Sequence, residues 1–326
     1  MIVYQRTIPI WKPWEPIRTI RTLFTYHLYK LQIMRKIFYL LMIISLVSCK
    51  KTPPPSPCTN CPPEVDSNNI NLSILIDLSD RIDPKTNPNP TMEYFQRDTE
   101  YIKSIEKGFL NHIKSKKIIT YDDQMQVFFN PEPSDPKMNE FTKELKVAFD
   151  KNTERNYFDS VDKKYSELPL NIYQSAIHDG NYVGSDIWEF FKNKVKDYCI
   201  KNDKRNILFI LTDGYMYHDN TKFAEENKTS YLTTKLIKTN SLTTSNFKDI
   251  IEKNKFGFVK ANDNLNNLEV IVLGINPEKG NPFEEAVIKE YWENWFKEMK
   301  IKNYQIKSAD LPSNLEPIIL KAIAGK

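Results

Sequence analysis

Short runs of consecutive apolar residues recur along the chain and are separated by polar segments. The runs at Leu72–Ile76, Asn206–Leu211 and Leu268–Leu273 contain almost no polar residue. Uninterrupted apolar runs of this length are typical of strands that are buried on both faces. Gln124–Phe129 and Tyr304–Ser308 indicate two further strands. The pattern therefore predicts a sheet that includes these five strands.

Between these runs, apolar residues recur every three or four positions, which is the spacing of a helix with one buried face. The predicted helices are Thr91–Ser115, Asn139–Phe149, Asp186–Ile200, Phe247–Lys255, Pro282–Lys300 and Asn314–Ile323. In the third of them, the expected buried side carries Ile187, Phe190, Phe191, Val195 and Tyr198. The rest of 131–182 contains several prolines and is predicted to be irregular. Segment 215–262 is rich in Asn, Thr and Lys and is predicted to be a surface insertion that can carry a binding loop.

Alternation of strands and helices favours an α/β fold, with a mostly parallel central sheet and helices on both faces. We expect this Rossmann-like arrangement to span residues 71–326 as one domain. Ligands of such sheets bind beyond the carboxyl ends of the strands. The loops that follow the apolar runs are therefore the first place to look for a site.

Three of these loops carry short oxygen-bearing side chains. Asp77 and Ser79 follow the first apolar run, Ser185 precedes a predicted helix, and Asp213 follows the run that ends at Leu211. We expect all three loops to meet at one edge of the sheet. Hydroxyl and carboxylate oxygens without histidine or thiol suit a hard divalent cation such as Mg²⁺. Asp77, Ser79, Ser185 and Asp213 are therefore the predicted metal ligands.

The three loops read "DLSDR" at 77–81, "GSDI" at 184–187 and "LTDG" at 211–214. In this order they resemble the metal-ion-dependent adhesion site of von Willebrand factor A-like domains. The resemblance covers about residues 71–326. It implies that Asp77 and Ser79 are first-loop ligands, that Ser185 stands in for a threonine, and that Asp213 binds the ion directly or through water. In the family the ion keeps an open position for an acidic group on a partner protein, so the resemblance implies a binding module.

Arg81 departs from this family pattern, because it stands where the family has a second serine. A guanidinium cannot ligate a cation. If Arg81 points inward, its charge takes the place of the ion and pairs with Asp77 or Asp213. If it points outward, Mg²⁺, Mn²⁺ or Ca²⁺ can complete its coordination with water. The residues predicted to modulate the site or contact the partner are Asp80, Arg81, Asp186 and Gly214.

The N-terminal region reads as a bacterial lipoprotein signal. Residues 34–49 join a basic pair, an eleven-residue apolar core and the sequence "LVSC", which resembles a lipobox with Cys49 as the acylated residue. The core is shorter than a membrane span, although a short transmembrane anchor is the alternative. Met34 stands where such a signal starts, so residues 1–33 either precede the true start or belong to the removed segment 1–48. The resemblance implies a lipid anchor in the outer membrane, facing the periplasm, because neither an aspartate nor an acidic run follows Cys49.

Residues 49–70 are predicted to form a tether. The stretch "TPPPSPCTNCPP" is rich in proline and favours an extended spacer. Cys58 and Cys61 lie within it at a C-x-x-C spacing, but a thioredoxin-like context and two further metal ligands are missing nearby. A local disulfide or an intermolecular link is the interpretation that we favour for this pair. Cys199 lies in a helical pattern and is expected to pack in the core.

Charge and the remaining motifs exclude several classes of protein. The net charge of +4 comes from the N-terminus, because the residues from Cys49 onward contain 39 basic and 41 acidic side chains. This balance argues against a nucleic-acid-binding protein. A hydrolase is also disfavoured, since the second carboxylate of an aspartate-nucleophile phosphatase is replaced by Ser79 and the chain lacks a G-x-S-x-G elbow. Trp188, Trp292 and Trp295 are expected to pack in the core rather than to bind carbohydrate.

These observations predict a membrane-anchored, non-enzymatic binding module. It would recognise a protein partner through a divalent cation at the edge of the sheet. The alternative is a metal-free scaffold component of an envelope assembly with the same fold, and a metal-dependent hydrolase is the less favoured third possibility.

Overall fold

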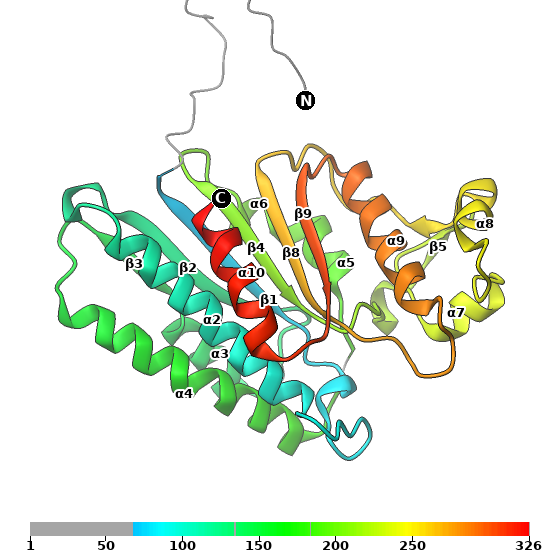
Figure 1. The fold of residues 1–326 in the computed structure, drawn as a ribbon, viewed down its shortest axis with the longest axis horizontal. Helices are drawn as coiled ribbons and strands as arrows, with labels where there is room; N and C mark the ends of the chain where they lie inside the picture. Colours follow the sequence, from blue (N-terminus) through cyan, green and yellow to red (C-terminus); the bar gives the residue numbers. More distant parts are fainter. Residues whose placement is uncertain (1–67, 134, 183, 326) are drawn as a thin grey trace, which may run out of the picture. The chain divides into compact units, whose positions relative to one another are not determined.

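The computed structural model describes residues 68–133, 135–182 and 184–325. The predictions for the signal region, Cys49, Cys58 and Cys61 lie outside these residues. At the centre of the described part is a six-stranded sheet with the order β3-β2-β1-β4-β8-β9 (Figure 1). Its strands are β1 (Ile70–Ile76), β2 (Asp122–Phe129), β3 (Val147–Asp150), β4 (Arg205–Leu211), β8 (Leu268–Ile275) and β9 (Asn303–Ser308). All neighbouring strands are parallel except β3, which pairs antiparallel with β2.

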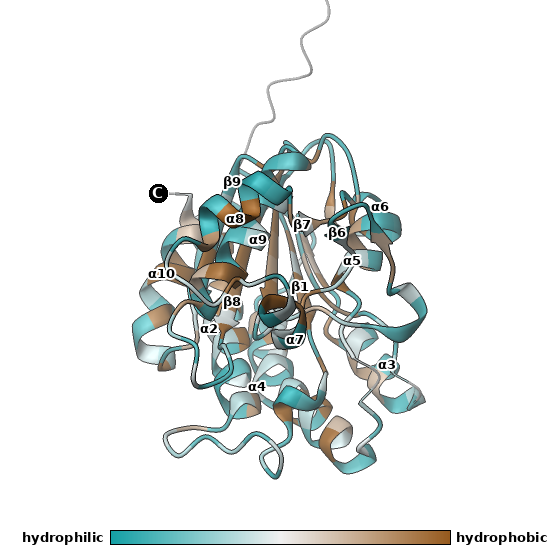
Figure 2. Ribbon diagram, turned by 90° about the vertical axis from the view of Figure 1, so that its right-hand side faces the viewer, coloured by the Kyte–Doolittle hydropathy of each residue, from teal (hydrophilic) through white to brown (hydrophobic). Residues whose placement is uncertain are grey.

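Alternate residues of the central strands supply two separate cores. Ile74 and Ile76 of β1 point into one core, and Leu75 points into the other. The first core is covered by α2 (Tyr94–Lys114), α4 (Asn156–Asp179) and α10 (Pro312–Ala324), and the second by α6 (Val195–Cys199) and α9 (Glu284–Glu298). Figure 2 shows the hydrophobic strands between more polar helices. The α/β fold with a mostly parallel sheet and helices on both faces is thus confirmed.

The prediction of an irregular segment at 131–182 is wrong. It contains α3 (Pro136–Glu144), the edge strand β3 and the 24-residue helix α4. The expected helix Asn139–Phe149 ends early because buried Val147 and Phe149 alternate with exposed neighbours, which is the period of a strand. The proline that argued against helix α4, Pro169, lies inside it with its ring buried. Packing of the apolar face therefore outweighs the roughly 3 kcal/mol that an interior proline costs a helix.

The predicted helix Asp186–Ile200 is divided into three parts. A short α5 (Ile187–Glu189) leads into a wider π turn, η3 (Phe190–Lys194), and then into α6. A π turn holds one more residue than an α turn, so it shifts every later side chain by one position around the axis. Cys199 is therefore buried as expected, whereas Tyr198, which was predicted to be on the buried side, is 49% exposed.

Segment 215–262 is more than a polar insertion. It contains η4 (Asp219–Thr221), the short strands β5 (Ala224–Glu225), β6 (Lys228–Thr229) and β7 (Gly257–Phe258), and the helices α7 (Thr234–Thr239) and α8 (Phe247–Asn254). Its sparse apolar residues are buried in the second core: Met216, Leu232, Ile237, Leu242, Phe247, Ile251 and Phe258. The prediction of a surface insertion is therefore wrong for these residues, which belong to the core. Sequence analysis missed them because they are few and widely spaced within a polar segment.

The tryptophans contribute to the second core, as expected. Trp188, Trp292 and Trp295 are buried, and the indole N–H of Trp292 donates to the Gly214 carbonyl at 2.8 Å. The helix that carries two of them therefore also supports the loop after β4. Among the described residues, no helix is both long enough and apolar enough to cross a membrane.

Glu106 on α2 is a buried carboxylate whose Oε1 has no hydrogen-bond partner among the described residues. Burial, together with the nearby Asp162 carboxylate, raises the pKa of Glu106 to about 7 from an ordinary value of 4.5. A group whose pKa is raised in the folded state favours folding at low pH. Its contribution is fully present below pH 4.5 and is lost as the pH rises towards 7.

We therefore expect the effect of Glu106→Gln on the free energy of unfolding to depend on pH. The change that it causes at pH 8 should be more stabilising, by about 2 to 3 kcal/mol, than the change that it causes at pH 4. Chemical denaturation at both pH values measures this difference. Glu100→Gln, an exposed site on the same helix, is the matched control and should show almost no pH-dependent change. An equal effect of Glu106→Gln at the two pH values would contradict the prediction.

Candidate functional site

The carboxyl ends of β1, β4 and β8 meet at one rim of the sheet, because the three strands are adjacent and parallel. Backbone hydrogen bonds hold the loops beyond them together. The Asp77 N–H donates to the Leu211 carbonyl at 3.0 Å, and the Asn276 N–H donates to the Asp213 carbonyl at 2.9 Å. The expected convergence of the first and third predicted loops is therefore present.

A pocket of about 540 Å³ opens at this rim, and we call it the rim pocket. Three of the four predicted metal ligands line it: Ser79, Ser185 and Asp213. Asp80 and Arg81 also line it, as do Tyr94, Tyr215, Tyr217, Asn276, Glu278 and Lys279 from neighbouring loops. Most of the predicted residues are thus brought together in one pocket. This pocket also includes polar residues that lie outside the three sequence motifs.

Asp77 lies beneath the rim pocket and is only 3% exposed. Its Oδ1 accepts a hydrogen bond from the Ser79 N–H at 2.9 Å, which fixes the turn after β1. Its Oδ2 accepts from the Thr212 hydroxyl at 2.8 Å, so it also joins the loop after β4. Both carboxylate oxygens are therefore engaged in holding the loops of the rim.

Arg81 points inward, the first of the two orientations considered from the sequence. It lies on the single turn η1 (Asp80–Ile82) and is 6% exposed. Its Nη2 donates to Asp98 Oδ2 at 2.6 Å and to the carbonyls of Asp77 and Leu211 at 3.1 and 3.0 Å. Its Nε lies 3.6 Å from Asp77 Oδ2. The carboxylates of Asp98 and Asp77 outweigh the effect of burial and hold the pKa of Arg81 above its usual value, so this cation is permanent.

Asp213 carries the other carboxylate of the predicted ligand set. It is half-buried, and its Oδ1 accepts from the Tyr215 N–H at 3.0 Å. Burial and the nearby Asp77 carboxylate raise the pKa of Asp213 to about 7, and Arg81 opposes this increase. The carboxylates of Asp77 and Asp213 thus still repel each other although the Arg81 guanidinium is beside them. A bound cation would reduce this repulsion.

Ser185 is held by a backbone bridge to the loop after β4. Its N–H donates to the Tyr217 carbonyl at 2.9 Å, and the Tyr217 N–H donates back to the Ser185 carbonyl at 3.2 Å. The preceding Gly184 has φ +87°, and a Cβ there would lie 2.3 Å from the Tyr217 carbonyl oxygen. Within the described residues, the buried Ser185 Oγ has no hydrogen-bond partner, and Ser185 is one of the residues that line the rim pocket.

Two other predicted residues have structural roles. Gly214 has φ +99°, and a Cβ there would lie 2.5 Å from Ile288 of α9, so only glycine fits. Asp186 is buried outside the rim pocket, and its carboxylate accepts from the Glu189 N–H and the Thr221 hydroxyl. Gly214 therefore shapes the loop after β4 through its backbone, whereas Asp186 is not among the groups that line the rim pocket.

The fit of a divalent cation can be judged from these side chains. Carboxylates in and beneath the rim pocket outnumber the cationic groups: Asp77, Asp80, Asp98, Asp213 and Glu278 against Arg81 and Lys279. The unpartnered Ser185 Oγ and the crowded Asp77 and Asp213 also favour a cation. Among the described residues no three His, Cys, Asp or Glu side chains lie close enough together to hold a metal, so such an ion would rely on serine hydroxyls and water. Ser79, Ser185 and Asp213 line one pocket and are the residues that could hold a largely hydrated Mg²⁺ there, beside the inward-pointing Arg81.

Sequence reasoning named Asp77 as a partner of an inward-pointing Arg81 but missed the other residues that hold this guanidinium. Asp98 on α2 pairs with it, and Tyr173 on α4 donates to the same Asp98 oxygen at 2.9 Å. Asp98 lies on the buried face of its helix, one position from Arg97 and three from Tyr101. The same buried face also carries Arg97, Ser104 and Glu106, so the sequence does not single out Asp98 as the partner of Arg81.

Comparison with known proteins provides no relative for this chain: no family model matches it, and no curated protein does. The resemblance to von Willebrand factor A-like domains thus remains an interpretation of the three loop motifs.

Breaking the Arg81–Asp98 pair should strongly destabilise the protein. We expect Arg81→Met to lower the free energy of unfolding by about 3 to 5 kcal/mol, because it leaves Asp98 and Asp77 buried without their cation. Denaturant unfolding of the single variants and of Arg81→Met/Asp98→Asn gives a double-mutant cycle. The double variant should lose less than the sum of the two single changes. Arg155→Met, at an exposed arginine, is the control, and additive losses in the cycle would refute the coupling.

Proposed function

We propose that this protein is a lipid-anchored envelope protein whose α/β domain binds a protein partner at the rim pocket. The anchor is Cys49, and the domain is a von Willebrand factor A-like module. This proposal rests above all on Ser79, Ser185 and Asp213, which lie at one pocket at the end of a parallel sheet, the usual ligand position in such folds.

In the proposed mode of binding, Mg²⁺ is held by Ser79, Ser185 and Asp213. When bound, the ion supplies a positive charge to which an acidic side chain of the partner can coordinate. Asp77 keeps the two loops in place and adds negative charge from beneath. Lys279 at the edge of the pocket provides a second contact for a partner carboxylate.

The inward position of Arg81 favours a second candidate function. In this alternative, the guanidinium replaces the ion, and the domain acts as a metal-free scaffold in an envelope assembly. The observation in its favour is the distance of 3.6 Å between Arg81 Nε and Asp77 Oδ2. A metal ion near the same carboxylate would be repelled by the guanidinium. Metal titration separates the two candidates.

Calorimetric titration of Mg²⁺ and Mn²⁺ into the full chain should show weak binding that Asp213→Asn abolishes. The double variant Arg81→Ser/Asp98→Asn should bind the metal ion about tenfold more tightly than the wild type. It removes the guanidinium, whose positive charge repels the ion, and it does not leave a buried Asp98 carboxylate without a partner. Ser160→Ala, an exposed serine on α4, is the control and should bind like the wild type. Binding only in the double variant would mean that Arg81 replaces the ion, and the scaffold candidate would then lead.

Capture of envelope proteins on the immobilised full chain tests partner recognition. We expect a partner that is retained with Mg²⁺ and released by a chelator. Amidation of carboxylates in the extract should abolish its capture, since the proposed contact is an acidic side chain. Lys279→Glu should weaken capture about tenfold through repulsion of the incoming carboxylate, whereas Lys302→Glu, at the opposite end of the sheet, should not. Capture that survives both chelation and amidation would refute the proposed contact.

A further inference from the structure

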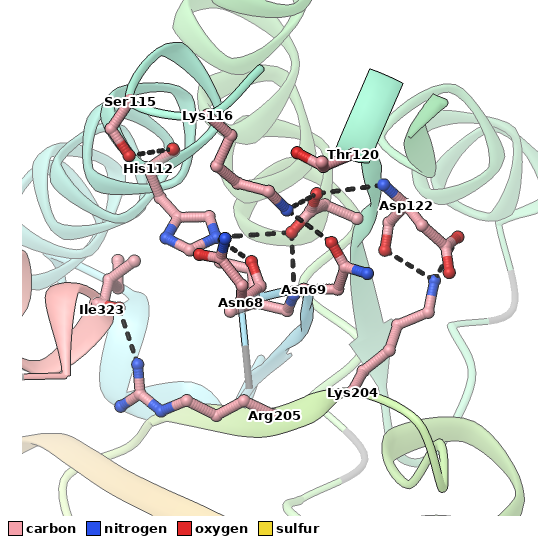
Figure 3. Close-up of polar contacts among 12 residues, drawn as sticks. Asn68, Asn69, His112, Ser115, Lys116, Thr120, Asp122, Lys204, Arg205 and Ile323 are labelled. Atoms are coloured by element: carbon pink, nitrogen blue, oxygen red, sulfur yellow. Dashed lines mark hydrogen bonds and ion pairs between the residues drawn. The ribbon is translucent and has the colours of Figure 1, made fainter. Parts of the chain in front are cut away.

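The end of the sheet opposite the rim pocket contains a compact polar cluster around the start of β1 (Figure 3). Asp123, at the start of β2, is its centre. Its carboxylate accepts from the Ile70 N–H at 2.7 Å and from the Lys116 ammonium at 2.6 Å. Lys116 also donates to Asn69 Oδ1, and His112 Nε2 lies 3.0 Å from the Asn68 carbonyl oxygen. The first described residues are therefore fixed against the end of α2.

The single turn η2 (Ile118–Thr120) follows this cluster directly and exposes two adjacent isoleucines. Ile118 is 46% exposed and Ile119 is 80% exposed. Only two other large hydrophobic side chains of the described residues are comparably exposed, Tyr198 and Leu311. An adjacent pair of this kind is a candidate interaction surface rather than ordinary surface composition.

The charges around η2 are mainly positive. Lys114 and Lys117 are exposed and form no ion pair among the described residues, and the Lys114 ammonium lies 5.6 Å from the centre of the Phe158 ring. Two nearby acidic side chains are already paired, Asp122 with Lys204 at 2.6 Å and Asp123 with Lys116, whereas Asp150, which lies opposite Asp122 on β3, is exposed. We call Lys114, Lys117, Ile118 and Ile119 the η2 patch. Apolar side chains flanked by exposed lysines are suited to the headgroup layer of an anionic membrane.

We propose that the η2 patch rests on the membrane surface beside the lipid anchor. This inference depends on the proposed acylation of Cys49 but not on the proposed metal or partner. Eighteen residues separate Cys49 from Asn68, and a proline-rich spacer of that length spans about 55 Å in the polyproline II conformation. The anchor thus keeps the patch at a high effective concentration near the bilayer, so a weak contact is sufficient.

This contact would orient the domain. The η2 patch is at the amino ends of the parallel strands, and the rim pocket is at their carboxyl ends. The seven residues of β1 separate the two ends by about 20 Å. With the patch on the membrane, the pocket faces away from the lipid, towards partners in the surrounding compartment.

Site-specific labelling of the full, lipid-anchored chain tests the inference. An environment-sensitive fluorophore is attached at Ile119→Cys or at Leu311→Cys, each combined with Cys58→Ser and Cys61→Ser. Cys199 is buried and does not compete for the label. Leu311 is the matched control, because it is exposed to 42% and follows β9 at the opposite end of the sheet. The vesicles contain phosphatidylethanolamine, phosphatidylglycerol and a lipid with a quencher in its headgroup.

We expect quenching of the label at position 119 to be at least several-fold stronger than at position 311. Lys114→Glu/Lys117→Glu should reduce this difference, and phosphatidylcholine in place of phosphatidylglycerol should reduce it in the same way. Equal quenching at the two positions, with the chain still floating with the vesicles, would overturn the η2 patch alone. Failure of the chain to float with vesicles would overturn the lipid anchor and this inference with it, and would leave the metal site at the rim untouched.

Discussion

One buried guanidinium connects the parts of the molecule that form the rim. Arg81 binds the last carbonyl of β4, the carbonyl of the residue that follows β1 and the carboxylate of Asp98 on α2. The loops after two strands and the helix that covers them thus share one cation. A cation at this depth requires paired carboxylates, and these carboxylates in turn require the cation. The position of Ser79, and with it one wall of the rim pocket, follows from this mutual dependence.

The same arrangement determines how strongly the rim can attract a second cation. Arg81 neutralises part of the charge on Asp77 and Asp98, but Asp80, Asp213 and Glu278 remain. An ion held at Asp213 and Ser185 would therefore experience both the attraction of the remaining carboxylates and the repulsion of the guanidinium. This balance favours weak binding, with most of the coordination supplied by water. A partner carboxylate that displaces one of these waters would then contribute a substantial part of the affinity.

The fold was predictable because parallel strands that are buried on both faces leave uninterrupted apolar runs, as in β1, β4 and β8. The site was predictable in part, because strand ends in an α/β sheet place their loops at one edge. The elements that were mispredicted share a physical cause: tertiary packing outweighed the local signal. Pro169 is accommodated inside α4, a π turn rotates Cys199 rather than Tyr198 into the core, and a few apolar residues bury segment 215–262. The pairing of Arg81 with Asp98 was also missed, because a contact between residues 17 positions apart leaves no local pattern.

Strand β1 relates the two ends of the domain physically. At its amino end, Asp123 and Lys116 fix the first described residues, and at its carboxyl end Asp77 and Arg81 fix the rim. Both ends are held by buried ion pairs, and the strand between them is buried along its whole length. A load applied through the predicted tether would therefore reach a clamped strand at the centre of the sheet before it reaches the pocket. An edge strand such as β3 or β9 pairs with one neighbour only, whereas β1 pairs with both β2 and β4, so the proposed anchor would pull on a strand that is held from both sides.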